Sequence, residues 1–405
     1  MSTPRYLDLP DQVRPLAIQS HRGTFAALEA QPASGVCERR PALLLPGFTG
    51  SKEDFIPVLH PLALAHRRVV AIDMRGQHES QGAPDPGGYA PGELATDVAA
   101  IADAVAPDGQ GVHLLGHSLG GLIAREAVLA LQTPILSLTL LSSGPGSLSG
   151  ERAELLRGML TVLEEAGGAD VAGRSPDRML AAIGMLWDEH LEPQARADGV
   201  PEQIIAFLHK RMLSNSPAGL VVMARYLLAC PDRTAELANL GGPPILVLYG
   251  ENDDAWRPAV QERMARRLGA QRVCIPGAGH SPAVEAPETT ASTLTAFWRA
   301  AEDSERRRGA HGTAGSRHSG QAPPPGLRPP PGHVAAPGSE PIAGRTAPGS
   351  PAPGSPAAGS PAAGSPALGP AASAGSSGEA ALPAPSPSHG RRGSEASLPS
   401  GQRAR

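Results

Sequence analysis

Along the chain up to about residue 300, short apolar runs alternate with segments of helical pattern. The runs are unbroken rather than alternating in polarity, which is typical of strands covered on both faces, as in a parallel sheet. The alternation predicts an α/β fold with a doubly wound, mostly parallel sheet. The predicted core strands are residues 41–46, 68–73, 111–116, 135–141, 244–249 and 272–275, and residues before 41 are expected to add antiparallel edge strands. The predicted helices between them are residues 55–66, 91–105, 119–131, 258–268 and 287–300.

The interval 149–240 carries no strand pattern and separates the fourth predicted core strand from the fifth. It contains helical patterns over 151–165, 176–190 and 201–230, with an interruption at 215–217. We interpret it as a helical lid, in which most apolar side chains pack the helices together and some face a substrate pocket. The apolar side chains concerned are Met159, Met179, Met185, Leu186, Trp187, Ile204, Ile205, Phe207, Met212 and Met223.

The C-terminal part of the chain differs in composition from the rest. It is rich in Pro, Gly, Ser and Ala and contains a five-residue repeat in which Ser350, Ser355, Ser360 and Ser365 each precede a proline. Such a composition cannot bury enough apolar surface to offset the conformational entropy of the chain. The sequence therefore predicts one domain over residues 15–302, with the lid at about 149–240, and a disordered tail over 303–405.

Charge, cysteine spacing and hydropathy argue against a nucleic-acid-binding protein, a metal site and a membrane-spanning protein. The formal net charge is -4 and the folded part carries no basic stripe, which argues against a nucleic-acid partner. Cys37, Cys230 and Cys274 lack disulfide or metal-ligand spacing, so we expect buried or half-buried thiols and neither a metal nor a cofactor. No apolar stretch reaches the length of a membrane span, and the N-terminus has no signal-peptide pattern, so a cytoplasmic location is expected.

Residues 116–121 read GHSLGG and lie where an apolar run gives way to a helical pattern. A serine at the apex of a sharp strand-to-helix turn, with glycines on both sides, is the pattern of a nucleophile elbow. A chain with 48 glycines also produces this pattern by chance, with Ser118 as an ordinary helix N-cap. The surrounding sequence must therefore supply the context.

That context comes from the residues after the fifth and sixth predicted core strands. A serine nucleophile needs a base, and the base needs a carboxylate that orients it. His280 follows the sixth strand and carboxylates follow the fifth, so the topology brings both to the sheet edge where Ser118 lies. We favour Asp253 as the acid, with Asp254 as a competitor and Glu251 as a weaker third choice. His280 alone could be a surface histidine, but the order serine, acid, histidine after separate strands singles it out.

The negative charge that develops on a carbonyl oxygen during attack needs two N–H donors. Leu119, directly after the serine at a predicted helix N-terminus, is expected to supply one backbone N–H. The loop 46–51 after the first core strand is expected to supply the other, with Phe48 as the favoured donor. The ring of Phe48 would also wall the acyl pocket.

Together these motifs resemble the alpha/beta-hydrolase fold family in its lidded form, over about residues 15–302. One departure is Pro46, which stands where many relatives have a histidine that props the oxyanion loop. The site residues that the resemblance implies are Ser118 as nucleophile, Asp253 as acid, His280 as base, and Phe48 and Leu119 as oxyanion-hole donors. The motifs that carry the resemblance are residues 46–51, 73–76, 116–121, 250–253 and 277–280.

The resemblance implies a serine hydrolase that cleaves an ester or another acyl bond of a small, apolar substrate through an acyl-enzyme intermediate, without a cofactor. The fold hosts many chemistries, so two alternatives stay open. One is a non-catalytic member of the fold that only binds a ligand. The other is a cofactor-free lyase or perhydrolase on the same site. A dehalogenase is disfavoured because a serine, and not an aspartate, holds the nucleophile position.

Deleting the chain from Gly309 onward should leave ester turnover and the melting temperature nearly unchanged, because a disordered tail contributes no core. Thermal melts and kcat/KM for a short p-nitrophenyl ester, measured on the full and truncated proteins, check this. A large loss of either quantity would show that the tail docks on the domain.

Overall fold

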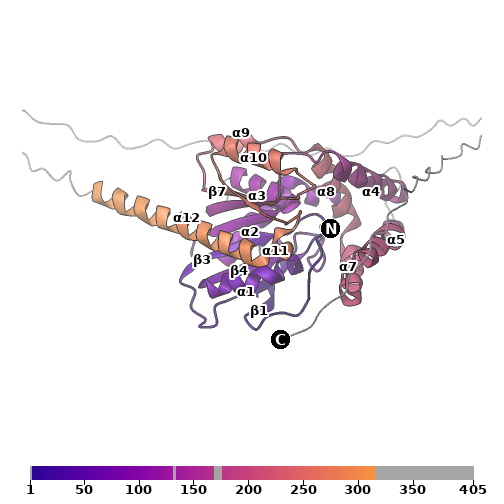
Figure 1. The fold of residues 1–405 in the computed structure, drawn as a ribbon, viewed down its shortest axis with the longest axis horizontal. Coiled ribbons are helices and arrows are strands. Elements are labelled where there is room, and N and C mark those ends of the chain that lie inside the picture. The colour runs from indigo at the N-terminus through magenta and orange to yellow at the C-terminus, as the bar shows by residue number, and fades with distance from the viewer. Residues whose placement is uncertain (1, 131–133, 168–175, 316–405) are drawn as a thin grey trace, which may run out of the picture. The chain divides into compact units, whose positions relative to one another are not determined.

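An eight-stranded sheet forms the centre of the computed structural model, which describes residues 2–130, 134–167 and 176–315 (Figure 1). The strand order is β1-β2-β4-β3-β5-β6-β7-β8. β2 pairs antiparallel with β1 and with β4, whereas all other neighbours in the sheet are parallel. The predicted doubly wound sheet with antiparallel strands at one edge is therefore confirmed. The strands are β1 Val13–Ser20, β2 Gly23–Ala30, β3 Arg39–Leu45, β4 Arg67–Ile72, β5 Val112–His117, β6 Ile135–Leu141, β7 Ile245–Gly250 and β8 Gln271–Ile275.

Helices cover both faces of the sheet. Alternate strand residues point to opposite faces, so Leu43 and Leu45 join a core beneath α2 and α3, while Leu44 joins a second core beneath α1 and α12. All three leucines are fully buried, which explains why the apolar run in β3 is unbroken. The helices of these two layers are α1 Ile56–Leu64, α2 Pro91–Val105, α3 Leu119–Ala130, α9 Thr234–Asn239, α10 Pro258–Leu268 and α12 Pro287–Gly315, with the short η1 Lys52–Phe55, η2 Pro86–Tyr89 and α11 Pro282–Glu285.

A helical cap lies between β6 and β7 in the chain, at the position of the predicted lid (Figure 1). It has an apolar core of its own around Trp187, whose ring stacks on His209 with the centroids 5.2 Å apart. α9 packs against α3 and α10 of the sheet layer instead, so the cap helices end at Ala229. The cap consists of α4 Glu151–Gly167, α5 Pro176–Leu186, the π-helical turn η3 Trp187–Leu191, α6 Glu192–Ala197, α7 Glu202–Ser214 and α8 Pro217–Ala229.

The last helix is longer than the sequence predicted. α12 continues to Gly315, past the predicted helix end at residue 300 and the predicted domain boundary at 302. The apolar periodicity fades there, but the charged residues that follow are good helix formers. Asp303 and Arg306 lie one turn apart on the helix, with 3.9 Å between Oδ1 and Nη1. The rest of the predicted tail, from residue 316 on, lies outside the described residues.

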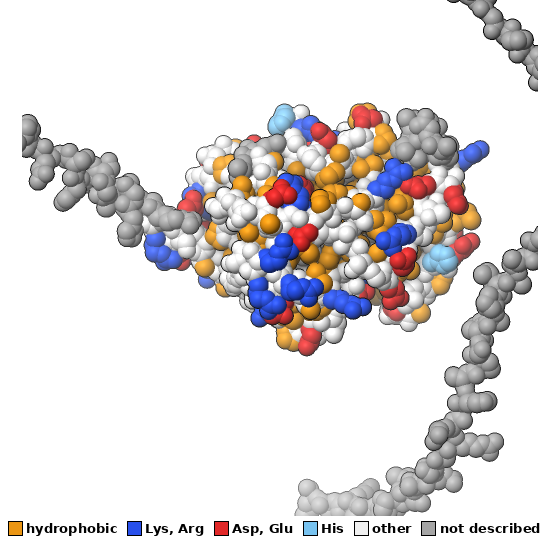
Figure 2. Space-filling model, turned by 90° about the horizontal axis from the view of Figure 1, so that it is seen from above, with side chains coloured by type: hydrophobic (Ala, Val, Ile, Leu, Met, Phe, Trp, Pro, Cys, Tyr) orange, Lys and Arg blue, Asp and Glu red, His pale blue; other side chains and the backbone are white. Residues whose placement is uncertain are grey.

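The surface of the described domain is mixed in charge. Basic and acidic side chains are interspersed over the face shown in Figure 2. In the part of the chain that the structure describes, no helix is both long and apolar enough to cross a membrane. Cys230 is buried as expected, but the expectation is wrong for Cys37 and Cys274, which are exposed. Cys274 lies on β8, an edge strand that has a neighbour on one side only.

A buried polar cluster lies at the N-terminal ends of the parallel strands. Glu302 of α12 pairs with Arg67 at 2.8 Å, with Arg39 at 3.0 Å and with His113 Nε2 at 3.1 Å. His113 Nδ1 accepts a hydrogen bond from Ser137 Oγ at 2.7 Å. Burial lowers the pKa of His113 to about 4. Burial alone would raise the pKa of Glu302, but His113 and Arg67 outweigh it and lower that pKa to about 2.

Replacing His113 with Gln should flatten the pH dependence of stability between pH 6.5 and pH 4. His113 stays neutral in the native protein in this range, whereas a histidine of the unfolded chain takes up a proton below its ordinary pKa of 6.5. For this group, the free energy of unfolding is at its maximum above that value and falls by about 1.4 kcal/mol per pH unit as the pH drops. Urea unfolding at several pH values measures the slope. His21→Gln, at an exposed position, is the control, and equal slopes for the two variants would contradict the prediction.

Candidate active site

Ser118 lies at the junction of β5 and α3, with a backbone φ of 54°. Non-glycine residues rarely adopt this left-handed conformation. A Cβ on Gly116 would lie 2.2 Å from the carbonyl oxygen of Gly120, so only glycine lets the strand and the helix approach this closely. The turn leaves the Ser118 side chain at the carboxyl end of β5, where it lines a cavity.

Two hydrogen bonds join side chains from three separate loops into a relay. His280 Nε2 lies 3.0 Å from Ser118 Oγ, and His280 Nδ1 lies 2.9 Å from Asp253 Oδ1. Because the ionised carboxylate can only accept, Nδ1 carries the proton and Nε2 is left to accept from the serine hydroxyl. Asp253 follows β7 and His280 follows β8, so parallel strands deliver all three groups to one edge of the sheet.

Asp253 is held by more than the imidazole. Its Oδ1 also accepts from the Ala255 backbone N–H at 3.0 Å, and its Oδ2 accepts from Gln261 Nε2 at 2.7 Å. Burial alone would raise the pKa of Asp253, but the hydrogen bond to His280 and these two further bonds hold it below its ordinary value. The carboxylate therefore stays ionised and fixed in place. Gln261 had no motif that would have singled it out in the sequence.

The other two carboxylates that the sequence left open have different partners. Asp254 forms two hydrogen bonds of 2.9 Å with Arg152 of the cap, and its side chain is 60% exposed. Glu251 accepts from the backbone N–H of Gly277 at 2.9 Å. Of the three candidates, the structure brings only Asp253 to His280.

His117, which sequence reasoning passed over, contacts His280. Its Nε2 donates to the backbone carbonyl of His280 at 2.8 Å, and the two ring centroids lie 5.0 Å apart. Burial and the neighbouring His280 lower the pKa of His117 to about 3. His117 is therefore neutral at neutral pH and adds no positive charge beside His280. Its position within the GHSLGG motif gave no indication of this partner.

The loop after β3 passes over Ser118. A Cβ on Gly47 would lie 3.1 Å from Ser118 Cβ, and Phe48 lines the same cavity as the serine. Leu119 is the first residue of α3, so its N–H has no partner within the helix. Among the described residues, neither the Phe48 nor the Leu119 N–H donates to another backbone group. These are the two donors that the sequence predicted for the oxyanion.

A buried glutamine supports this loop where Pro46 leaves it without the histidine of many relatives. Gln77 Nε2 donates to the carbonyl oxygen of Gly47 at 2.8 Å, and Gln77 Oε1 accepts from the Met74 N–H at 3.1 Å. Gln77 is fully buried in the loop after β4. The support of the oxyanion loop therefore comes from a side chain that no sequence motif indicated.

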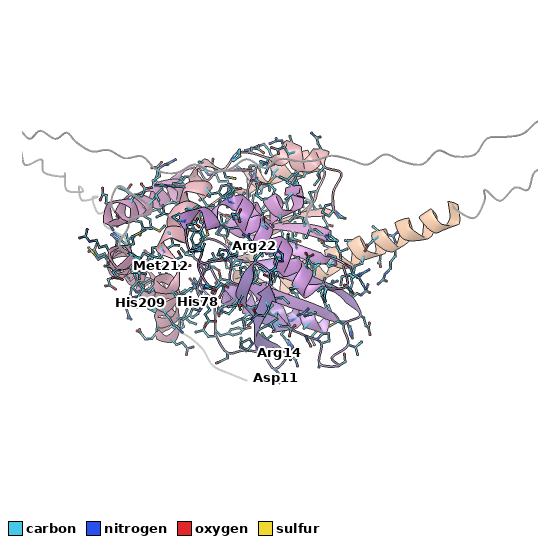
Figure 3. All side chains as sticks on the ribbon, turned by 180° about the vertical axis from the view of Figure 1, so that it is seen from behind. Asp11, Arg14, Arg22, His78, His209 and Met212 are labelled. Atoms are coloured by element: carbon cyan, nitrogen blue, oxygen red, sulfur yellow. The ribbon has the colours of Figure 1, made fainter. Side chains whose placement is uncertain are left out.

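A cavity of about 750 Å³ opens between the relay and the cap. Its volume is within the range of small-molecule sites. Of the apolar lid residues considered from the sequence, Met159, Leu186 and Met212 line it, and Met212 is labelled in Figure 3. Its other apolar lining residues are Phe48, Leu148, Leu155, Leu156, Val162, Leu191, Leu227 and Ala255, and its charged ones include Glu151, Arg152 and Glu154.

Glu53, His78 and Glu79 are the group of potential metal ligands found in the described residues. Lys52 Nζ lies 2.9 Å from Glu53 and 2.8 Å from both Asp73 and Glu79. Burial disfavours the charge on Lys52, but Asp73 and Glu53 raise its pKa above the ordinary value. Lys52 thus already pairs with the carboxylates of this cluster.

The chain is similar in sequence to proteins of known name. The chain is 29% identical over 262 residues to the dihydrolipoyllysine-residue acetyltransferase component of the acetoin cleaving system of Pseudomonas putida, covering 64% of this chain and 63% of that protein. Over 109 residues it is 38% identical to a protein of Variovorax paradoxus provisionally named a carbamate hydrolase, covering 27% of this chain and 40% of that protein. The chain thus spans less than two thirds of either relative.

Solved structures show the same fold. A thermophilic esterase from Thermogutta terrifontis is 24% identical, with a TM-score of 0.54, and the match covers 71% of this chain and 99% of the esterase. The model of the alpha/beta hydrolase family matches residues 42–293, which run from within β3 to beyond β8 and include the whole cap and all the residues of the relay. With the family model covering more than half of the chain, the protein belongs to the alpha/beta hydrolase family.

Proposed function

We propose that the protein is a serine hydrolase that cleaves an ester or a related acyl bond through a covalent acyl-enzyme. The observation that carries this proposal is the continuous relay from Asp253 through His280 to Ser118 Oγ, with distances of 2.9 Å and 3.0 Å. A serine hydroxyl becomes a useful nucleophile when a base within hydrogen-bond reach accepts its proton. The relay meets this requirement, and Ser118 and His280 line a largely apolar cavity.

Acylation begins when Ser118 Oγ attacks the carbonyl carbon of the substrate and passes its proton to His280 Nε2. The carbonyl oxygen becomes an oxyanion, and the backbone N–H groups of Phe48 and Leu119 donate to it. His280 then gives its proton to the leaving oxygen as the carbon–oxygen bond breaks. Water repeats the sequence on the acyl-enzyme, with His280 as base, and releases the acid and the free serine.

Asp253 has an orienting and electrostatic role in this scheme. Its carboxylate holds the His280 Nδ1 proton, which fixes the tautomer, and it stabilises the imidazolium that forms during attack. The hydrogen bonds from Ala255 and Gln261 keep Asp253 ionised, so the proton stays on the imidazole. His117 assists by anchoring the backbone of His280 while remaining neutral.

The cavity supports an apolar acyl group as the substrate part that enters the cap. Its wall comes largely from leucine and methionine side chains of the cap, whereas the charged residues come from the first turn of α4 and, with Asp54, from η1. The names of the relatives, a carbamate hydrolase, an acetyltransferase component and an esterase, describe reactions at acyl carbons. Reaction at an acyl carbon is the chemistry that the relay and the two N–H donors suit.

Replacing Ser118 with Ala should leave the fold intact and abolish both ester turnover and covalent labelling. Without the hydroxyl no acyl-enzyme forms, and losses on the order of 10⁶-fold in kcat are known for such replacements. Turnover of p-nitrophenyl esters of increasing acyl length and labelling by a fluorophosphonate probe measure the effect. Ser292→Ala, an exposed serine of α12, is the matched control and should behave as wild type. Turnover by Ser118→Ala near the wild-type rate would move the nucleophile elsewhere, and a wild-type protein that is not labelled would favour a binding protein.

Two neighbouring aspartates allow a sharp test of the acid. Asp253→Asn should lower kcat by about 10⁴-fold, because an amide donates where the carboxylate accepts and so favours the wrong tautomer of His280. Asp254→Asn should change kcat little, since its partner is Arg152 at the surface. Steady-state kinetics of both variants decide the assignment. Equal losses in the two variants, or a loss confined to Asp254→Asn, would contradict it.

A further inference from the structure

Arg211 of α7 is fully buried, and it reaches from the cap to partners outside the cap. Its Nη1 donates to Asp54 Oδ1 at 2.7 Å, and its Nη2 donates to the backbone carbonyl of Ser2 at 2.6 Å. Nη1 also lies 3.4 Å from Ser51 Oγ. The guanidinium carbon lies 5.4 Å from the centroid of the Phe207 ring, on the same helix. The side chain therefore joins the cap to the segment that follows β3.

Asp54 extends this contact to the oxyanion loop, defined as residues 47–51. Its Oδ2 accepts from the Ser51 N–H at 3.3 Å, and a Cβ on Gly50 would lie 2.6 Å from the same oxygen. The carboxylate thus packs directly against the backbone of the loop. Asp54 is buried, and burial raises its pKa although Arg211 opposes the shift. Without its counterion, this carboxylate would have to take up a proton or move.

The oxyanion loop needs support from outside because its backbone is strained. Thr49 has a φ of 57°, which a β-branched residue adopts only where its surroundings fix it. The turn is closed by the Gly50 N–H, which donates to the Gly47 carbonyl at 3.1 Å. Gln77 holds the first residue of the loop from the loop after β4. On the other side, the contact comes from Asp54 and, through it, from the cap.

We propose that Arg211 is a positioning residue that fixes the oxyanion loop through Asp54 and thereby ties the Phe48 N–H to the placement of α7. The inference rests on the proposed function, in which that N–H donates to the oxyanion. The next residue along α7, Met212, lines the cavity. An acyl group in the cavity would therefore contact, through Met212, the same helix α7 whose Arg211 holds the oxyanion loop.

A second contact fixes the end of α7 to the body. His78 Nδ1 lies 2.9 Å from Ser214 Oγ, and its ring packs edge-on against Phe207 with the centroids 5.5 Å apart. Figure 3 labels His78, His209 and Met212 in this region of the molecule. Phe207, Arg211 and Ser214 thus contact the rest of the protein from successive turns of α7. These contacts fix the position of α7 and with it the position of Arg211 relative to Asp54.

The test compares Arg211→Gln with wild type in two kinds of measurement. In kinetics with p-nitrophenyl esters, kcat should fall by about 10- to 100-fold, a share of the loss seen when an oxyanion donor is removed outright, while KM changes little. A boronic acid, whose adduct with Ser118 mimics the tetrahedral intermediate, should lose affinity by a similar factor. In hydrogen exchange, the Ser51 amide should exchange faster because its acceptor Asp54 is no longer held, and the Gly50 amide should follow because Asp54 packs against Gly50.

Two further variants keep the test decisive. Asp54→Asn combined with Arg211→Gln replaces the ion pair with two neutral amides, so the protein folds even if an unpaired Asp54 prevents folding of the single variant. Its kcat should be no lower than that of Arg211→Gln, since the two residues act as one unit. Arg225→Gln is the control: it breaks an exposed ion pair of 2.6 Å with Glu164 inside the cap and should leave kcat and loop exchange unchanged.

Unchanged kcat together with unchanged exchange of the loop amides in a folded Arg211 variant would overturn the proposal. A rise in KM alone would overturn it as well, because it would make Arg211 a residue of substrate binding. Failure of the proposed function would look different: the wild-type protein would not react with a fluorophosphonate. In that event the exchange of the Gly50 and Ser51 amides would still show whether Arg211 holds the loop.

Discussion

The left-handed backbone of Ser118 is the constraint on which the rest of the site depends. Such a conformation costs roughly 1–3 kcal/mol and persists only where neighbouring groups fix it. Here the Ser118 N–H donates to the carbonyl of Leu141 at 2.9 Å, and Ser143 Oγ donates to the carbonyl of Ser118 at 2.8 Å. Both partners lie at the end of β6, after which the chain enters the cap. The end of β6 therefore both fixes the Ser118 backbone and leads directly into the cap that covers Ser118.

The features that sequence reasoning found are those with a local pattern. Ser118 stands in a motif at a strand-to-helix change, and Asp253 and His280 follow strands whose apolar runs are continuous. Their meeting at one edge follows from parallel topology, so the relay was predictable once the strands were. The cap helices were equally accessible, since the predicted 151–165 corresponds to α4 at Glu151–Gly167. The end of α12 was missed because helix propensity continues there after the apolar period ends, and the short helices α6, α9 and α11 were not predicted at all.

The groups that sequence reasoning could not find are those whose partners are remote in the chain and carry no motif. Arg211 and Asp54 are 157 positions apart, and each alone reads as an ordinary charged residue. Gln77 and Gln261 are amides that look like surface residues in the sequence, yet both are fully buried. Their roles depend on which loops the strand order brings together. The tertiary structure shows this, but no local sequence pattern does. The sequence could name the groups of the relay but not the groups that hold them.

Two of the charged contacts between the cap and the sheet domain differ in their access to water. Arg211 and Asp54 have side chains that are 0% and 3% exposed, whereas Arg152 and Asp254 are 33% and 60% exposed. Attraction between exposed charges is weak and falls further as salt shortens the screening length, which is about 8 Å at physiological ionic strength. We therefore expect salt to weaken the ion pair of Arg152, which lines the cavity, with Asp254 more than the buried ion pair of Arg211 with Asp54. We therefore expect ionic strength to act on the edge of the cap beside the cavity more than on the loop that Arg211 contacts.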